Sequence, residues 1–125
     1  EVMNMKKLLI TATTVIVIAV AGFIIFMSGG RSIISGYSLR CNNDTYMIIE
    51  EAGSPIRYSF SNAVSKNVEK LTDGDRILIV SDLINESYPG STRAYFVFKL
   101  SEGEINDIPE DTLTSLEELG WYRSE

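Results

Sequence analysis

The sequence predicts a mainly β protein, in which an N-terminal transmembrane helix precedes a small five-stranded barrel with a C-terminal helix. Three observations predict this fold class. Residues 8–27 are an unbroken apolar run, five strand-like segments follow between residues 37 and 100, and leucines then recur at helical spacing. The predicted organisation is a membrane anchor at residues 1–30, a tether at 31–35, and one barrel domain with its C-terminal helix at 36–125.

The apolar run of residues 8–27 contains 20 residues and no charge. As a helix it reaches roughly 30 Å, which is the thickness of the hydrocarbon core of a bilayer. Lys6 and Lys7 precede the run and Arg31 follows it. Because the flank with more basic residues is retained in the cytoplasm, we expect the N-terminus to stay inside. The chain is then a single-pass protein of the cell membrane with its C-terminal domain outside.

A cleaved signal peptide is the alternative interpretation of this run. Residues 19–21, Ala-Val-Ala, have the small-x-small form that signal peptidase reads. Cleavage there would leave the apolar segment 23–27 exposed at the new N-terminus, so a retained anchor is the preferred interpretation.

The strand-like segments are rich in β-branched and aromatic residues and are bounded by Gly, Pro, Asn and Asp. They comprise residues 37–41, 45–51, 56–60, 76–80 and 93–100. The fourth segment is the most continuous apolar run of the domain, which predicts a strand buried on both faces. Apolar residues at helical spacing in 61–71 indicate a short helix between the third and fourth strands.

Alternation in the last strand places Ala94, Phe96, Phe98 and Leu100 on one face. Before this strand, the pair Pro89-Gly90 predicts the centre of a type II turn, because proline fixes φ and glycine permits a positive φ.

A C-terminal helix is predicted after residue 107. Asp107 is the expected N-cap, and Leu113, Leu116 and Leu119 form an apolar stripe. Gly120 is placed to end the helix.

Five strands with a helical link between the third and fourth fit a small OB-like barrel. The fourth strand and the segment after it contain a Gly-Asp-x-Ile motif and a Glu-Ser-Tyr-Pro motif, formed by Gly74, Asp75, Ile77, Glu86, Ser87, Tyr88 and Pro89. In these motifs the chain resembles small exported OB-like proteins of Gram-positive bacteria. The resemblance covers residues 36–100 and implies an exported barrel without an established activity. Many of those proteins resemble lipoproteins, whereas this chain has a spanning run and no lipobox.

The domain after the anchor is acidic. Three of the 11 basic residues and one of the 17 acidic residues lie in residues 1–31, which leaves 8 basic and 16 acidic residues and a net charge of −8. Nucleic-acid binding depends on cationic side chains that displace counterions from phosphates, so we expect no nucleic acid as a partner. The same charge disfavours binding to an anionic membrane surface.

The sequence contains no histidine and one cysteine, Cys41, which is interpreted as a small apolar residue of a strand. Histidine is the commonest general base and the commonest metal ligand. Without it we expect no cofactor, no metal site and no enzymatic activity. The segment 73–75 lacks the spaced ligands of an EF-hand and is predicted to be a turn. A bend between Asp82 and Glu86 would bring two carboxylates together, which leaves a carboxylate-dependent hydrolase as a distant alternative.

Three residues are candidates for facing a ligand: Glu86, Tyr88 and Arg93. Tyr88 is expected either to cover the mouth of the barrel or to bind a ligand there. OB barrels use this face for ligands, an argument by analogy from the fold.

Together these observations predict a membrane-tethered extracytoplasmic binding or interaction module without enzymatic activity. Its ligand or envelope protein partner is not identified by the sequence, and we expect a monomer anchored by residues 8–27. The main alternative is a small structural subunit of a membrane complex, and the carboxylate hydrolase ranks third.

Overall fold

A computed structural model describes residues 2–123. The chain divides into two compact units, Glu1–Arg31 and Ser32–Glu125. The first unit is dominated by one helix, α1, which spans Val2–Ser28. Its segment Asn4–Ser28 is long enough and apolar enough to cross a membrane, and a signal sequence would share these properties. The Thr14 hydroxyl donates a hydrogen bond to the carbonyl of Ile10 at 2.8 Å, so the helix satisfies this polar group without a neighbour.

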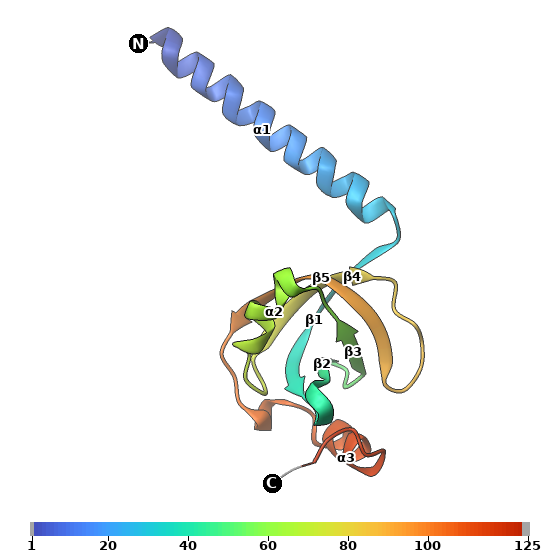
Figure 1. Ribbon diagram of the computed structural model, residues 1–125. Helices are drawn as coiled ribbons and strands as arrows, with labels where there is room; N and C mark the ends of the chain where they lie inside the picture. The colour runs from blue at the N-terminus through green and yellow to red at the C-terminus, as the bar shows by residue number, and fades with distance from the viewer. Residues whose placement is uncertain (1, 124–125) are drawn as a thin grey trace. The chain divides into compact units, whose positions relative to one another are not determined.

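The second unit is a closed barrel of five strands in the order β1-β2-β3-β5-β4 (Figure 1). The strands are β1 (Arg31–Arg40), β2 (Tyr46–Glu50), β3 (Pro55–Ser59), β4 (Arg76–Asp82) and β5 (Gly90–Ser101). Strand β3 pairs with β5 in parallel, and β1–β2, β2–β3 and β4–β5 are antiparallel. Helix α2 (Asn62–Glu69) connects β3 to β4, as predicted. This is the OB topology, and it confirms the predicted fold class.

The inward-facing side chains of the strands form the first hydrophobic cluster, which α2 closes with Val64 and Val68. Its strand members are Ile34, Tyr46, Ile48, Ile56, Tyr58, Ile77, Ile79, Ala94 and Val97. Four of its residues are completely inaccessible to solvent: Ile48, Val68, Ile77 and Ile79.

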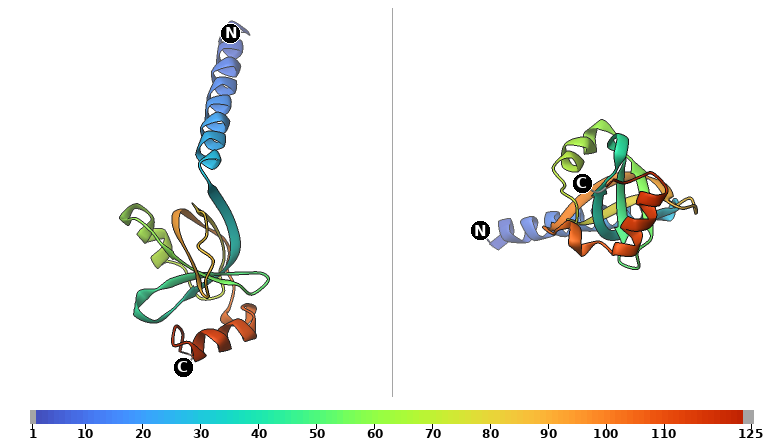
Figure 2. Two further views of the ribbon diagram at one scale, coloured as in Figure 1. Left: turned by 90° about the vertical axis from the view of Figure 1, so that its right-hand side faces the viewer. Right: turned by 90° about the horizontal axis from the view of Figure 1, so that it is seen from below.

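A second hydrophobic cluster lies outside the barrel and holds helix α3 (Glu110–Glu118). Leu39, Met47 and Ile49 from β1 and β2 meet Leu116 of the helix in this cluster. Strand β2 is consequently buried on both faces. Figure 2 shows α2 and α3 against different parts of the barrel.

Helix α3 follows the predicted pattern only in part. Leu116 is fully buried and Leu113 packs against the second cluster, but Leu119 is 56% exposed. Gly120 has a positive φ of 83°, as expected for a residue that ends a helix. The prediction of Asp107 as N-cap is wrong, because its carboxylate accepts a hydrogen bond from the Glu104 N–H, 2.9 Å away, in the preceding 3-10 turn.

Residues 31–35, predicted to be a short tether, belong to a strand instead. Strand β1 begins at Arg31, and Ile34 is already buried in the first cluster. Pairing in the barrel therefore orders a segment whose small polar residues suggested a linker.

The structure also contradicts the type II turn at Pro89-Gly90. The Tyr88–Pro89 peptide is cis, and Gly90 does not belong to the glycines with positive φ. Gly90 is instead the first residue of β5 and pairs with Ile56 of β3. The parallel pairing to β3, a non-local contact, determines the conformation here.

The phase of the last strand differs from the predicted one. The register of β4 and β5 shifts between Ser81–Ala94 and Val80–Phe96, so Tyr95 is an extra residue at a bulge. Ala94 and Val97 are buried, whereas Phe96 and Phe98 are about half exposed. The prediction that Ala94 shares a face with these aromatic residues is therefore wrong.

The apolar run of β4 predicted a strand that is buried on both faces. In the structure the residues of β4 are not uniformly buried. Ile77 and Ile79 point into the core and are inaccessible to solvent, while Leu78 between them is partly exposed. Val80, which pairs with Phe96 on the outer face, is buried, so the outer face of β4 is covered only in part.

Candidate functional site

The candidate site is a pocket of about 470 Å³ beside β2 and β3, called the aromatic pocket here. It is lined by Asp44, Thr45, Tyr46, Arg57, Tyr58, Ser59, Phe60 and Ser91. Its rings pack on one another: the centroids of Tyr46 and Phe60 lie 5.5 Å apart in a T-shaped arrangement, and those of Tyr58 and Phe60 lie 6.0 Å apart. This packing fixes the rings and leaves polar side chains at the rim.

Tyr58, which lines this pocket, has an unusual hydroxyl group. The side chain is 5% exposed, and its oxygen has no hydrogen-bond partner among the described residues. Burial, and to a lesser degree the neighbouring Tyr46, raises the pKa of Tyr58 far above its ordinary value, so the phenol stays neutral. It can therefore donate one hydrogen bond and accept others.

Alternation in β3 explains how Tyr58 reaches this position. Ile56 and Tyr58 point into the barrel, while Arg57 and Ser59 point outward. The guanidinium of Arg57 lies 5.5 Å from the ring centroid of Trp121. This contact gives the outer rim of the pocket a cation of defined position.

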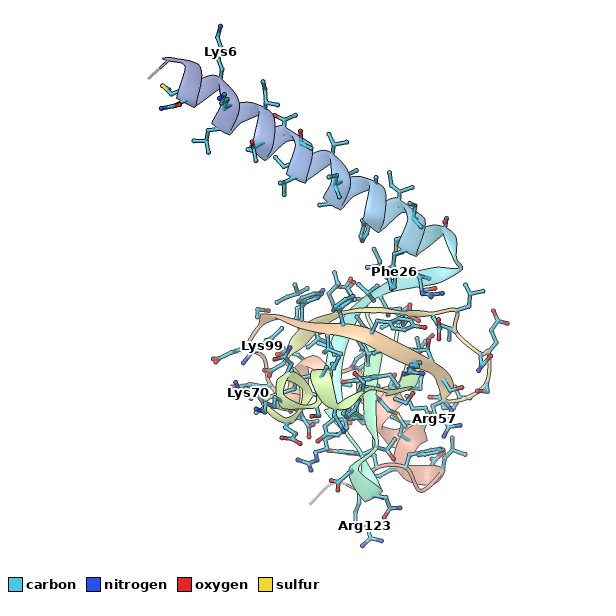
Figure 3. The ribbon with its side chains drawn as sticks, turned by 45° about the horizontal axis from the view of Figure 1, so that its top comes forward. Lys6, Phe26, Arg57, Lys70, Lys99 and Arg123 are labelled. Atoms are coloured by element: carbon cyan, nitrogen blue, oxygen red, sulfur yellow. The ribbon has the colours of Figure 1, made fainter. Side chains whose placement is uncertain are left out.

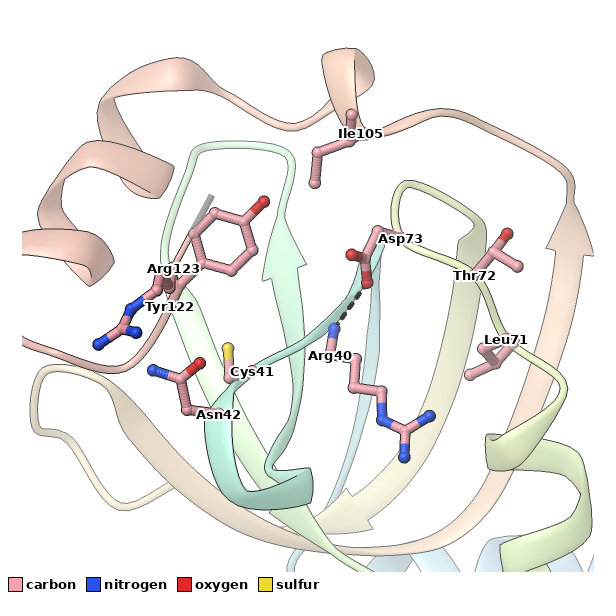
Figure 4. A pocket seen from close by; sticks show the side chains of 9 residues that line it. All are labelled: Arg40, Cys41, Asn42, Leu71, Thr72, Asp73, Ile105, Tyr122 and Arg123. Carbon is pink, nitrogen blue, oxygen red and sulfur yellow. Dashed lines mark hydrogen bonds between the residues drawn. The ribbon is translucent and has the colours of Figure 1, made fainter. Parts of the chain in front are cut away.

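A second pocket, of about 570 Å³, lies at the end of β1 and is called the arginine pocket here (Figure 4). It is lined by Arg40, Cys41, Asn42, Leu71, Thr72, Asp73, Ile105, Tyr122 and Arg123. The Asp73 carboxylate accepts a hydrogen bond from the backbone N–H of Arg40, 2.8 Å away, which joins β1 to the turn before β4. The walls thus carry both charge signs, so the pocket has no single preferred ligand charge.

One ion pair joins a residue of the arginine pocket to a residue of the aromatic pocket. The Arg40 guanidinium donates to the Asp44 carboxylate at 2.6 Å, and Arg40 lines the arginine pocket while Asp44 lines the aromatic pocket. The hydrogen bond to Asp44 and then the nearby Tyr46 raise the pKa of Arg40. The guanidinium also lies 5.3 Å from the Tyr46 ring centroid, so this pair supports a wall of the aromatic pocket.

Cys41 lines the arginine pocket but is 7% exposed. Burial, with a smaller contribution from Asp73, raises the pKa of its thiol to about 12. The reactive thiolate is therefore scarce at neutral pH, as expected for a small apolar residue. The predicted position on the inner face of a strand is wrong, because β1 ends at Arg40 and Cys41 packs in the second cluster.

The structure brings together two of the three residues predicted to face a ligand. Glu86 and Tyr88 line a pocket of about 290 Å³ between the β4–β5 loop and the end of the β2–β3 hairpin, together with Glu50. Arg93 does not line this pocket, and its guanidinium lies 6.0 Å from the ring centroid of Tyr95. Tyr88 is 53% exposed, so it does not close the barrel.

The carboxylate pairs considered in the sequence take separate positions. Asp82 accepts a hydrogen bond from the Tyr95 hydroxyl at 2.8 Å and does not line the pocket of Glu86. Asp75 is inaccessible to solvent and bonded within the protein, whereas Asp73 bonds to β1. Among residues 2–123 no group of three or more Cys, Asp or Glu side chains is arranged to hold a metal ion.

Sequence reasoning missed the aromatic pocket. The available signal was the strict alternation of residues 56–60, which places two aromatic side chains of one strand on its inner face. Alternation by itself identifies both as core residues. The missing partner of the Tyr58 hydroxyl becomes visible only when the surrounding elements are in place.

No family model, no curated protein and no solved structure matches this chain.

Proposed function

We propose that this chain is a membrane-tethered binding module that holds a ligand in the aromatic pocket. Helix α1 anchors it, and the barrel lies on the extracytoplasmic side. The resemblance of the Gly-Asp-x-Ile and Glu-Ser-Tyr-Pro motifs to small exported OB-like proteins supports the same location.

The single observation that carries this proposal is the Tyr58 hydroxyl. A buried polar group without a partner costs about 1–3 kcal/mol of stability. Phenylalanine would fill the same space without that cost. Groups of this kind therefore call for a functional explanation, and a ligand that hydrogen-bonds to the phenol in the pocket supplies one.

The pocket also has the composition of a binding site. Apolar rings form its inner wall, and Asp44, Arg57, Ser59 and Ser91 provide polar groups at its rim. Such a combination holds a ligand by burial and orients it by a few hydrogen bonds. The sequence contains no histidine, the commonest general base, which favours binding without catalysis.

The location is supported by the flanks of α1. Lys6 and Lys7 precede the apolar segment, and basic residues are retained in the cytoplasm. This orientation places the barrel on the opposite side of the membrane, where envelope components are the available ligands.

Native mass spectrometry of the full chain, purified from its own membranes in mild detergent, tests the proposal. We expect the wild-type protein to carry a non-covalent small-molecule adduct that Tyr58→Phe loses. Tyr95→Phe is the matched control, because it removes a phenol that already bonds to Asp82 and lines none of the pockets described above.

A wild-type chain without an adduct would contradict the proposal. So would an adduct of equal abundance in Tyr58→Phe and the wild type, because the hydroxyl would then contribute nothing to binding. Loss from both tyrosine variants would indicate an effect on the barrel as a whole and would also reject the assigned role of Tyr58.

A further inference from the structure

The bulge at Tyr95 reverses which side chains in the second half of β5 face the core and which face outward. Its outer face presents Phe96 and Phe98, and Leu100 is exposed farther along the strand, at a second register shift between Ile77–Lys99 and Arg76–Ser101. These three residues, called the apolar strip here, have exposed fractions of 51%, 50% and 56%. The rings of Phe96 and Phe98 are stacked at 6.2 Å between centroids, with 16° between their planes. The strip is therefore an ordered apolar surface and not a set of scattered side chains.

A groove of about 370 Å³ runs beside the strip, between α2 and β5. Its lining includes Phe98 and Leu71 together with Lys70 and Lys99. Figure 3 shows the two lysines at one edge of the barrel, away from Arg57. The ammonium of Lys99 lies 3.5 Å from the carboxylates of Asp75 and Glu102, so Lys70 is the more available cation.

We infer that the apolar strip and Lys70 dock on the surface of the phospholipid bilayer in which α1 is inserted. Aromatic and aliphatic side chains beside a lysine are the composition of interfacial segments, in which the rings enter the headgroup region and the ammonium meets phosphate. The inference rests on the membrane insertion of α1 that is part of the proposed function, and it is independent of the aromatic pocket.

Covalent connection favours the bilayer over other occupants. Only Gly29 and Gly30 separate α1 from β1, so a membrane-inserted chain holds its barrel at a high effective concentration of lipid. A weak apolar contact is then sufficient. A second copy of the chain is disfavoured, because pairing would bring together two domains that each carry a net charge of −8.

The negative charge of the domain is compatible with this contact, because it determines which face of the barrel approaches the bilayer. Acidic residues of the barrel are repelled by lipid phosphates, whereas the face with Phe98, Leu100 and Lys70 combines apolar exposure with a cation, and the exposed Glu102 beside it lies 3.5 Å from the ammonium of Lys99.

The full chain reconstituted in vesicles of phosphatidylcholine and phosphatidylglycerol tests the inference. An environment-sensitive fluorophore is attached to Leu100→Cys, and the buried Cys41 with its raised thiol pKa leaves the new cysteine as the reactive one. The matched control carries the label on Glu118→Cys, which is exposed on α3. Nitroxide-bearing lipids then report which label meets the bilayer.

We expect the label at residue 100 to shift to shorter emission wavelength and to be quenched several-fold more strongly than the label at residue 118. Lys70→Glu should reduce the quenching at residue 100 without changing the thermal transition, because Lys70 is exposed. Resistance of the chain to alkaline extraction establishes independently that α1 is inserted.

Equal quenching of the two labels in an inserted chain would overturn the inference and leave the aromatic pocket untouched. A label that is shielded in native membranes but not in vesicles would also overturn it, since the occupant of the strip would then be a protein.

Discussion

The buried carboxylate of Asp75 accepts a hydrogen bond from the backbone N–H of Gly103, 3.2 Å away, and so joins the start of β4 to the chain that leaves β5. The N–H and hydroxyl of Thr72 also donate to this carboxylate, at 2.9 and 3.0 Å. The Lys99 ammonium lies 3.5 Å away. Asp75 is therefore a structural centre of the barrel, within the segment 73–75 that the sequence predicted to be a turn.

This arrangement predicts a loss of stability in acid. Burial raises the pKa of Asp75, but the hydrogen bonds from Thr72 and Gly103 and the charge of Lys99 outweigh it, so the pKa lies below its ordinary value. The folded pKa is thus lower than the unfolded one, which is about 3.9. The stabilisation is complete above the unfolded pKa and is lost as the pH falls toward the folded one.

Asp75→Asn should therefore lower the free energy of unfolding at neutral pH by about 2 kcal/mol and flatten its decline below about pH 4. Urea unfolding of the detergent-solubilised chain measures this through the fluorescence of Trp121, which packs on the second cluster. Glu118→Gln, on the exposed face of α3, is the control. An unchanged acid dependence in Asp75→Asn would show that another carboxylate is responsible.

Two tyrosine substitutions should change stability in opposite directions. Tyr58→Phe removes a buried hydroxyl without a partner and should raise the free energy of unfolding by about 1 kcal/mol. Tyr95→Phe breaks the 2.8 Å hydrogen bond to Asp82 and should lower it by about 1 kcal/mol. Urea unfolding in the absence of ligand provides the comparison. A destabilised Tyr58→Phe would mean that the hydroxyl has a partner within the fold.

Two glycines with positive φ should differ in their tolerance of alanine. Gly120 has a φ of 83°, and a methyl group added there would meet open space, since nothing lies within 4 Å of its position. Gly120→Ala should cost about 1 kcal/mol, from the backbone conformation alone. At Gly74, with a φ of 94°, the added carbon would lie 1.9 Å from the Glu104 carbonyl oxygen.

Gly74→Ala should accordingly destabilise the barrel by clearly more than Gly120→Ala, because the turn before β4 and the segment after β5 cannot both keep their positions. Thermal unfolding followed by circular dichroism ranks the two variants. Similar midpoints would indicate that the segment around Glu104 moves away without cost.

Topology can be tested with protease added to intact spheroplasts. If Lys6 and Lys7 hold the N-terminus inside, residues 32–125 should be accessible and should be digested without lysis. Detection with an antibody against the barrel follows the digestion, and a cytoplasmic protein serves as the control for leakage. Digestion that occurs only after lysis would reverse the proposed orientation.

Several features of this protein were predictable from local patterns. The apolar run predicted α1, the alternating segments predicted five strands, and the spacing of Val64 and Val68 predicted α2. In each case the pattern lies within one element. Its apolar residues recur every two residues in a strand or every 3.6 residues in a helix, because one side of the element is buried. The turn at Gly74 was equally local, since Thr-Asp-Gly-Asp specifies its own backbone conformation.

The candidate site was predictable only in part. Glu86 and Tyr88 meet in one pocket because both belong to the same loop, whereas Arg93 is drawn into β5 and turned toward Tyr95. The aromatic pocket escaped prediction because Tyr46 and Tyr58 come from neighbouring strands, and Phe60 follows the second of them. The register between paired strands decides which rings come into contact, and this register is not encoded within a single segment.

By itself, the sequence determined the elements of this protein, their order and the OB-like class, because burial of apolar residues follows the period of each helix and strand. Only the tertiary structure decided where those periods break. The bulge at Tyr95 exposes Phe98, the pairing to β3 turns Gly90 from a turn residue into a strand residue, and packing leaves the Tyr58 hydroxyl without a partner. Each of these results depends on contacts between residues distant in sequence, and no local pattern encodes such contacts.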